Sequence, residues 1–207
     1  MSDFVEIHPD NPQPRLITRA AAVFRAGGVV VYPTDSCYAL GCAIGEKSAL
    51  DRIRQIRRVD AKHNFTLVCR DLSEISTYAR IDNSAYRQLK SLTPGPFTFI
   101  YQATKQVPRR LLHPKRRAIG IRVPNTPIVR DLLSELGEPI LSTTLILPGD
   151  ESPLTDTYEI RESIAHCVDL IIDGGHCGTE PTTVVDMTKE PPVLVRAGKG
   201  DTSLFDA

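Results

Sequence analysis

Short apolar runs alternate with helix-like patterns along most of the chain, and this alternation limits the fold more than any other feature of the sequence. Strands are predicted at 29–32, 65–69, 97–102, 118–123, 140–147, 169–173, 182–187 and 193–196. Helices are predicted at 12–26, 46–58, 71–79, 83–92, 127–136 and 158–167. Because helices repeatedly follow strands, we predict an α/β fold with a twisted, open sheet of mixed parallel and antiparallel strands, flanked by helices. No helix separates the last two strands, so we predict that they pair antiparallel.

One domain is predicted to span residues 1–207, with a core at about 12–200 and a short mobile C-terminal tail. No apolar run approaches the ~20 residues of a membrane helix, and the N-terminus has neither the basic nor the apolar part of a secretory signal. The five cysteines lack the spacing of a disulfide framework, which indicates reduced thiols. These features together predict a cytoplasmic protein without a membrane partner.

Basic residues are concentrated in one part of the chain, although Lys+Arg and Asp+Glu total 25 each. Residues 83–130 contain ten basic residues and no acidic one. If these side chains share a face, they form a positive surface that is either simply solvated or binds a phosphate-rich ligand such as structured RNA. Few aromatic residues accompany them, which disfavours stacking on single-stranded bases. The predicted RNA-binding patch consists of Arg52, Arg54, Arg58, Arg109, Arg110, Lys115, Arg116 and Arg117.

The segment VVVYPTDSCYALGC, residues 29–42, starts as a buried strand and then becomes polar. Pro33, Thr34, Asp35 and Ser36 follow the apolar run directly. They can form an ordinary polar turn, or they can form a binding loop beyond a strand end, where ligand sites in α/β sheets often lie. Under the second interpretation Thr34 faces an amino-acid or nucleotide pocket. Thr34→Val would then weaken ligand binding and leave the melting temperature nearly unchanged.

Other hydroxyl and basic residues also lie in or beside predicted strands. Such residues can orient an amino acid or a sugar and can hold phosphate or carboxylate oxygens. Taken singly, each can equally be a surface charge or a satisfied polar group. No glycine-rich nucleotide motif is present, and the His-Cys dipeptides at 166–167 and 176–177 are not favoured as metal ligands, so no structural metal is predicted. The set comprises Thr34, Arg57, Arg58, His63, Arg122, Ser142, Thr143, Thr144, Thr182, Thr183 and Arg196.

Several segments resemble those of the YrdC-like family, and they occur in the family's order. They are GGVVVYPTDSCYALGC, TPGPFTFI, IGIRVPNTP, ILSTT, PTTVVDMT and LVRAG. RIRQIRR, HNFTLVCRDLSEISTYA, VPRRLL and IHPDNPQ are most similar to the YciO branch, and the resemblance covers nearly the whole chain. It implies a single YrdC-like α/β domain with a concave, positive face. It also implies synthesis of L-threonylcarbamoyl-AMP from threonine, bicarbonate and ATP, the first step toward threonylcarbamoyladenosine in certain tRNAs.

The resemblance also implies roles for individual residues. Thr34 matches a threonine-binding hydroxyl, Arg122 the arginine that holds the threonine carboxylate, and Arg196 a phosphate-binding arginine. Arg57 takes the place of the lysine in a Lys-x-Arg signature, whose arginine falls on Val59. The implied catalytic residues are Arg57 and Arg122, the substrate-binding residues Thr34, Arg122, Thr144 and Thr182, and the nucleotide-binding residues Arg57, His63 and Arg196.

Two further family positions differ in this chain. The asparagine of a Ser-x-Asn signature falls on Ile146, and a pocket histidine falls on Val68. With Val59, these differences leave three functions open: a synthase that is weak or uses another acyl acceptor or nucleotide, a double-stranded RNA-binding protein without synthase activity, or a hydrolase of small carbamoyl compounds or nucleotides. The implied ligands of the synthase are ATP as substrate, with Mg²⁺, threonine and bicarbonate. The implied macromolecular partner is tRNA or double-stranded RNA.

Overall fold

The computed structural model describes residues 2–60, 63–112, 117–203 and 205. The helices are α1 (Pro14–Arg25), α2 (Lys47–Arg57), α3 (Leu72–Tyr78), α4 (Asn83–Leu92), α5 (Pro127–Leu136) and α6 (Thr157–Ile164), with a 3₁₀ turn η1 (Arg109–Leu111). The strands are β1 (Asp3–Glu6), β2 (Val30–Tyr32), β3 (Ala39–Ala43), β4 (Thr66–Val68), β5 (Phe97–Gln102), β6 (Ala118–Arg122), β7 (Ile140–Thr144), β8 (Leu170–Asp173), β9 (Thr183–Asp186) and β10 (Val193–Arg196). None of the helices in the described residues has both the length and the apolar character that a membrane crossing requires.

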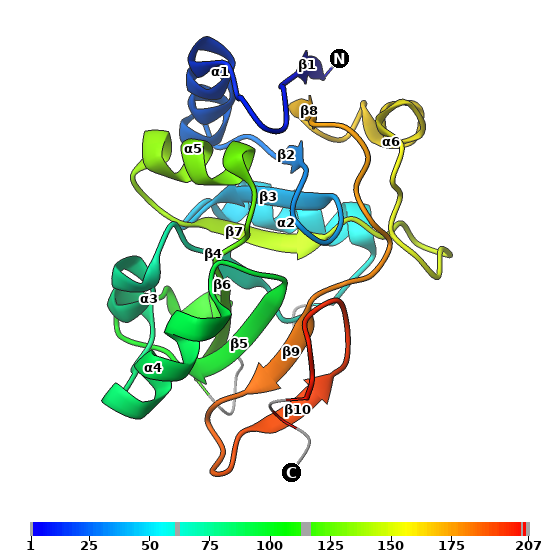
Figure 1. Cartoon of the computed structure of the whole chain (residues 1–207). Helices are drawn as coiled ribbons and strands as arrows, with labels where there is room; N and C mark the ends of the chain where they lie inside the picture. The colour runs from blue at the N-terminus through cyan, green and yellow to red at the C-terminus, as the bar shows by residue number, and fades with distance from the viewer. Residues whose placement is uncertain (1, 61–62, 113–116, 204, 206–207) are drawn as a thin grey trace.

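The strands form one mixed sheet in the order β1-β8-β2-β3-β7-β4-β6-β5-β9-β10 (Figure 1). β1 and β2 run parallel to β8, while β3 is antiparallel to both β2 and β7. Further along the sheet, β4 is parallel to β6, and β5 is parallel to β9. This arrangement confirms the predicted α/β fold with a mixed open sheet, and β9 and β10 pair antiparallel as expected.

Each face of the sheet carries its own hydrophobic core, because neighbouring residues of a strand point to opposite faces. In β2, Val31 belongs to the first core and Tyr32 to the second. In β7, Leu141 and Ile140 are divided in the same way. The first core includes buried side chains of α2, α3, α4 and α6, whereas α1 and α5 contribute to the second. Figure 1 shows α1 and α5 side by side near one end of the sheet, so the rest of the second face is available for a site.

Helix α2 ends directly after Arg57. Arg58 follows in the left-handed conformation, with φ of 47°, and its N–H donates to the carbonyls of Arg54 and Gln55. A left-handed residue is a common helix stop, although glycine is the usual choice because it has no Cβ. The stop holds Arg57 in the last turn, from which its guanidinium reaches the Ile146 carbonyl beyond β7.

The sequence pattern predicts neither β1 nor β3. β3 has the sequence ALGCA, which is rich in small residues and poor in the β-branched residues that favour strands. It is buried on both faces between β2 and β7, so tertiary packing sets its conformation. β1 has one buried residue, Val5, and becomes a strand by pairing with β8.

The last strand, β10, lies at an edge of the sheet and pairs with β9. Two of its apolar side chains, Val193 and Val195, are exposed. The chain beyond β10 turns back on the sheet, where Thr183 Oγ1 donates to the Gly200 carbonyl at 2.7 Å. Mobility of the C-terminal tail stays a prediction.

Candidate functional site

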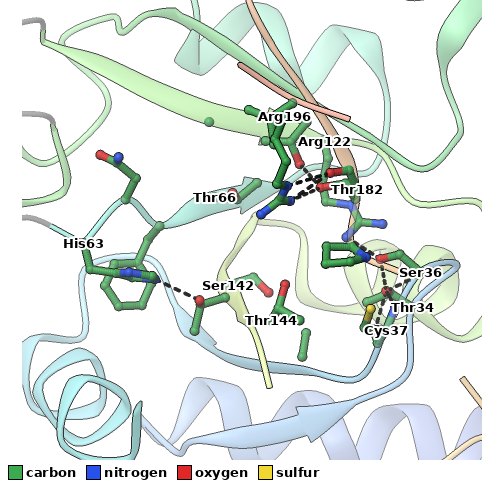
Figure 2. Close-up of a pocket in the computed structure, with 18 of the residues that line it drawn as sticks. Thr34, Ser36, Cys37, His63, Thr66, Arg122, Ser142, Thr144, Thr182 and Arg196 are labelled. Carbon is green, nitrogen blue, oxygen red and sulfur yellow. Dashed lines mark hydrogen bonds between the residues drawn. The ribbon is translucent and has the colours of Figure 1, made fainter. Parts of the chain in front are cut away.

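A cavity of about 550 Å³ opens on the second face of the sheet (Figure 2). Its floor consists of strand residues whose side chains point to the second face, because their neighbours along each strand point into the first core. One row crosses five neighbouring strands through Ile100, Gly120, Thr66, Ser142 and Gly41, and its first four members line the cavity. Short side chains at the centre of the row leave the floor recessed. The volume is typical of a pocket for a small molecule.

The loop after β2 forms one wall of the cavity and is held together by the Thr34 hydroxyl (Figure 2). Thr34 Oγ1 donates to the Cys37 carbonyl at 2.6 Å and accepts the N–H groups of Ser36 and Cys37, both at 3.2 Å. Thr34 also lines the cavity, although only 8% of the residue is exposed. The loop is therefore both a polar turn and a cavity wall. Because the hydroxyl already stabilises the turn, the expectation of an unchanged melting temperature in Thr34→Val does not fit this geometry.

Arg122 enters the same wall from the end of β6 and is 8% exposed. Its Nη2 forms an ion pair with Asp35, and its Nη1 donates to Ser36 Oγ at 3.4 Å. Asp35 in turn accepts the N–H of Asn125 at 2.8 Å. The Nε of Arg122 is buried and has no hydrogen-bond partner among the described residues. An unpaired buried donor is costly, so Arg122 is held here at some expense of stability.

Arg196, the last residue of β10, lies close to Arg122 (Figure 2). It donates to the Thr182 carbonyl through Nη2 at 2.8 Å and through Nε at 3.2 Å. Thr182 Oγ1 lies 2.9 Å from Thr98 Oγ1, so a short chain of hydroxyls leads from Arg196 to the floor. Burial lowers the pKa of Arg196. Because the oxygens of Thr182 that hold the Arg196 guanidinium are neutral, no carboxylate offsets its charge, and this charge is available to an anion.

Arg57 and His63 also line the cavity, and Figure 2 shows His63 on the side away from Arg122. Arg57 Nη1 donates to the Ile146 carbonyl at 2.6 Å, and its buried Nε has no hydrogen-bond partner in the described part of the chain. His63 Nε2 lies 3.0 Å from Thr143 Oγ1. Burial, and then the charge of Arg57, lower the pKa of His63 below its usual value of 6.5. The imidazole is therefore neutral at pH 7 and adds no further charge.

The balance of charge around the cavity favours an anion. Arg57, Arg122 and Arg196 line the cavity, and Asp35 pairs with one of them. Three guanidinium groups facing one half-buried space suit a ligand with several anionic oxygens. The described lining contains no Asp or Glu, and no group of three or more His, Cys, Asp or Glu side chains in the described ranges is arranged so that it could hold a metal ion. The lining therefore does not fit a Mg²⁺ ion held by protein carboxylates.

The residues to which the family resemblance assigns a small-molecule role, unlike Arg58 and Thr183 of the wider set, all line this cavity. They come from distant parts of the chain, and the fold brings them together at one face of the sheet. Their individual roles stay predictions. The residues are Thr34, Arg57, His63, Arg122, Thr144, Thr182 and Arg196.

The two altered signature positions, Val59 and Ile146, and the position of the pocket histidine, Val68, lie in different surroundings. Ile146 lines the cavity, and its carbonyl holds Arg57. Val68 is buried in the second core. Val59 follows α2, and its N–H donates to the Arg54 carbonyl at 3.1 Å. Of the three, Ile146 is the residue whose side chain bears on the described cavity.

Part of the predicted RNA-binding patch is engaged within the protein. Arg52 pairs with Asp169 at 2.8 Å, and Arg54 pairs with Asp51 at 3.1 Å. These pairs offset the charge that the two arginines would offer to RNA. The other members are Arg58, Arg109, Arg110 and Arg117, which are exposed, and Lys115 and Arg116, which lie outside the described residues.

Two hydroxyls of the floor, Thr66 and Thr98, and the ion-pair partner of Arg122 are not predicted from the sequence. A signal for Thr98 is present, because it stands between Phe97 and Phe99, and a polar residue between two core residues of a strand faces the other side. No local pattern identifies Asp35 as the partner of an arginine 87 positions away.

The chain matches known proteins over nearly its whole length. The family model Sua5_yciO_yrdC, described as "Telomere recombination", matches residues 22–198. The chain is 57% identical to YciO of Escherichia coli over 205 residues, which cover 99% of this chain and 100% of YciO. The crystal structure of E. coli YciO superposes on it with a TM-score of 0.95, again covering 99% of this chain and 100% of that one.

Two more distant relatives carry the name of an activity or a ligand. The threonylcarbamoyl-AMP synthase of Nitrosococcus oceani is 31% identical over 156 residues, which cover 75% of this chain and 83% of the synthase. The crystal structure of Pyrococcus abyssi Sua5 complexed with L-threonine has a TM-score of 0.87 and 26% identity, and covers 95% of this chain and 58% of that one. The family match and these relatives show that the chain belongs to the Sua5/YciO/YrdC family.

Proposed function

We propose that the protein is an ATP-dependent L-threonylcarbamoyl-AMP synthase whose product serves the threonylcarbamoyl modification of adenosine in tRNA. The observation that carries this proposal is the group of three arginines, with one carboxylate partner, around a hydroxyl-lined cavity. Two relatives support it: one is named as this synthase, and the structure of another is complexed with L-threonine.

The proposed reaction has two steps. The threonine amine adds to bicarbonate with loss of water and gives a carbamate. A carbamate oxygen then attacks the α-phosphorus of ATP, and the bond to the β-phosphate oxygen breaks to release pyrophosphate. Charge builds up on phosphate oxygens in the second step, so fixed cations and correct positioning supply most of the catalysis. No covalent intermediate with the protein is needed.

The three arginines divide between the two substrates. The Arg122 guanidinium binds the threonine carboxylate, and Thr144 and Thr182, which line the same cavity, contribute hydroxyls to the amino acid. Arg57 and Arg196 bind phosphate oxygens. His63 is neutral at pH 7 and provides a hydrogen bond to the nucleotide rather than a charge. The described lining offers no carboxylate to Mg²⁺, so no step is assigned to this ion.

The two altered signature positions bear on the rate. Val59 and Ile146 cannot make the hydrogen bonds of an arginine and an asparagine. A hydrogen bond to a charged group contributes about 1.5–3 kcal/mol, and losing two such bonds slows a reaction by about two to four orders of magnitude. We therefore propose a synthase that is slower than relatives with both signatures intact.

Pyrophosphate release tests the proposal. Purified protein is incubated with ATP, Mg²⁺, bicarbonate and threonine, each component is omitted in turn, and the nucleotide products are identified. Threonine- and bicarbonate-dependent pyrophosphate is expected, and Arg196→Ala should reduce it about tenfold or more. Arg130→Ala is the matched control, because Arg130 is exposed on α5 and pairs with Asp131. ATP that stays intact, or that is hydrolysed without regard to threonine, would contradict the proposal.

We also propose that structured RNA binds the exposed part of the basic patch. Arg110 donates to the Gly45 carbonyl, two residues before the start of α2, so η1 lies beside the N-terminal end of α2 while the exposed Arg58 follows its C-terminal end. Binding through phosphates should weaken steeply as salt increases. Arg58→Ala with Arg109→Ala should lower the affinity for a tRNA and the steepness of its salt dependence, and Arg130→Ala should change neither. RNA affinity that does not depend on salt would exclude this interaction.

A further inference from the structure

A buried tyrosine contacts the floor of the cavity at one point. Tyr32, the last residue of β2, is fully buried, and its hydroxyl donates to Ser142 Oγ at 2.6 Å. Ser142 lies in the floor row, between Gly41 of β3 and Thr66 of β4, and lines the cavity (Figure 2). Burial raises the pKa of Tyr32 to about 12, so the phenol keeps its proton at pH 7.

Gly41 makes this contact possible. A Cβ atom on Gly41 would lie 2.7 Å from Tyr32 Cε1 and 2.6 Å from Ile140 Cγ2, closer than real Cβ atoms approach their neighbours. The ring therefore packs directly on the backbone of β3, and a larger residue at position 41 would displace it. Glycine within a strand weakens the strand, so its presence here fits a close approach that the site requires.

The contact also orients the Ser142 hydroxyl. A serine hydroxyl has one donor and two acceptor positions. Tyr32 fills an acceptor position, and no acceptor for the Ser142 proton occurs among the described residues. By contrast, the Thr34 hydroxyl donates its proton to the Cys37 carbonyl, and the Thr182 hydroxyl is hydrogen-bonded to that of Thr98. Ser142 thus keeps a donor that can point into the cavity.

We propose that Ser142, positioned by Tyr32, donates a hydrogen bond to an anionic oxygen of the ligand in this cavity, from a carboxylate or a phosphate group. The surrounding arginines favour an anion over a neutral acceptor, and Arg122 is close enough to act electrostatically on the Tyr32 hydroxyl. Hydrogen bonds to ionised acceptors are about twice as strong as neutral ones. The inference rests on the proposed function in taking this cavity as the ligand site.

Isothermal titration calorimetry tests the proposal with ATP, pyrophosphate and L-threonine as separate probes. Ser142→Ala should weaken at least one probe by about tenfold or more, and Tyr32→Phe should weaken the same probe by about threefold or more. Loss of threonine affinity identifies a carboxylate acceptor, and loss of pyrophosphate affinity identifies a phosphate acceptor. Once Ser142 is replaced by Ala, Tyr32→Phe should cause no further loss.

Tyr101→Phe is the matched control, since Tyr101 is buried in the first core and its hydroxyl has no hydrogen-bond partner among the described residues. If the Tyr32 and Ser142 variants lose stability but bind every probe as the wild type does, the pair is purely structural and the inference fails. If the losses of affinity caused by Tyr32→Phe and Ser142→Ala add up in the double variant, Tyr32 does not act by positioning Ser142. Weakened binding without threonine-dependent pyrophosphate release would retain the inference and contradict the synthase. A wild type that binds none of the probes would overturn both.

Discussion

The Thr34 hydroxyl holds together the loop that forms one wall of the cavity. Its Oγ1 joins Ser36 and Cys37 to the loop, so Thr34→Val should lower the free energy of unfolding by about 1–3 kcal/mol, because buried N–H groups lose their acceptor. Thr34→Ser keeps the hydroxyl and should retain most of the stability. Urea denaturation of both variants measures the difference, and equal stability of Thr34→Val and wild type would show that the loop does not depend on this hydroxyl.

His63 gives the protein a pH dependence of known sign. Its pKa is lowered in the folded state, so below pH 6.5 the unfolded chain binds a proton more readily than the folded one. The contribution of His63 to stability is therefore complete above its unfolded pKa and decreases as the pH falls toward its folded pKa. His63→Gln removes this proton uptake. When the pH is lowered from about 7.5 to about 5, the free energy of unfolding should decrease less in His63→Gln than in the wild type, as measured by denaturation. Identical slopes would indicate an unperturbed histidine.

A substitution at the C-cap of α2 should make the protein more stable. Arg58 has φ of 47°, which a Cβ atom disfavours. Arg58→Gly should therefore raise the free energy of unfolding by about 0.5–1 kcal/mol, less than the full steric gain because glycine also makes the unfolded chain more flexible. Arg54→Gly, inside the same helix, should lower it by about 1 kcal/mol. Thermal denaturation distinguishes the two, and destabilisation by both would mean that the Arg58 side chain has a contact of its own.

Elements with local signals were predictable from the sequence, and elements without them were not. Helix α5 is predicted with correct ends because Thr126 caps it, Pro127 begins it and Gly137 ends it with φ of 74°. β5 and β10 are also predicted with correct bounds. β3 gives no such signal, because its small residues form a strand only when β2 and β7 enclose it. The candidate site residues could be named, but the pairing of Arg122 with Asp35 depends on tertiary structure and could not.

The described cavity is lined by the strands from β3 to β10 in the sheet order, the loop after β2, and residues of α2 and η1, and it owes no lining residue to β1 or α1. Deletion of residues 1–8 removes β1 with two buried side chains, Val5 and Ile7. Each contributes about 1.5–3 kcal/mol by burial, so stability should fall clearly while the affinity for ATP changes by less than about twofold. Denaturation and calorimetry on the shortened chain test this separation. A parallel loss of affinity would show that the two ends of the sheet are coupled.

The alternation along the strands has a consequence for how this protein can evolve. In β5, Thr98 and Ile100 face the cavity, while the residues that alternate with them, Phe97, Phe99 and Tyr101, belong to the first core. The register of this strand therefore determines both the lining of the cavity and the packing of the core. Point substitutions can change the ligand one position at a time. Insertion or deletion of one codon would exchange the two sets, placing phenylalanines in the cavity and threonine in the core. Lineages of this protein should therefore diverge in specificity through substitutions, and gain or lose residues in the loops.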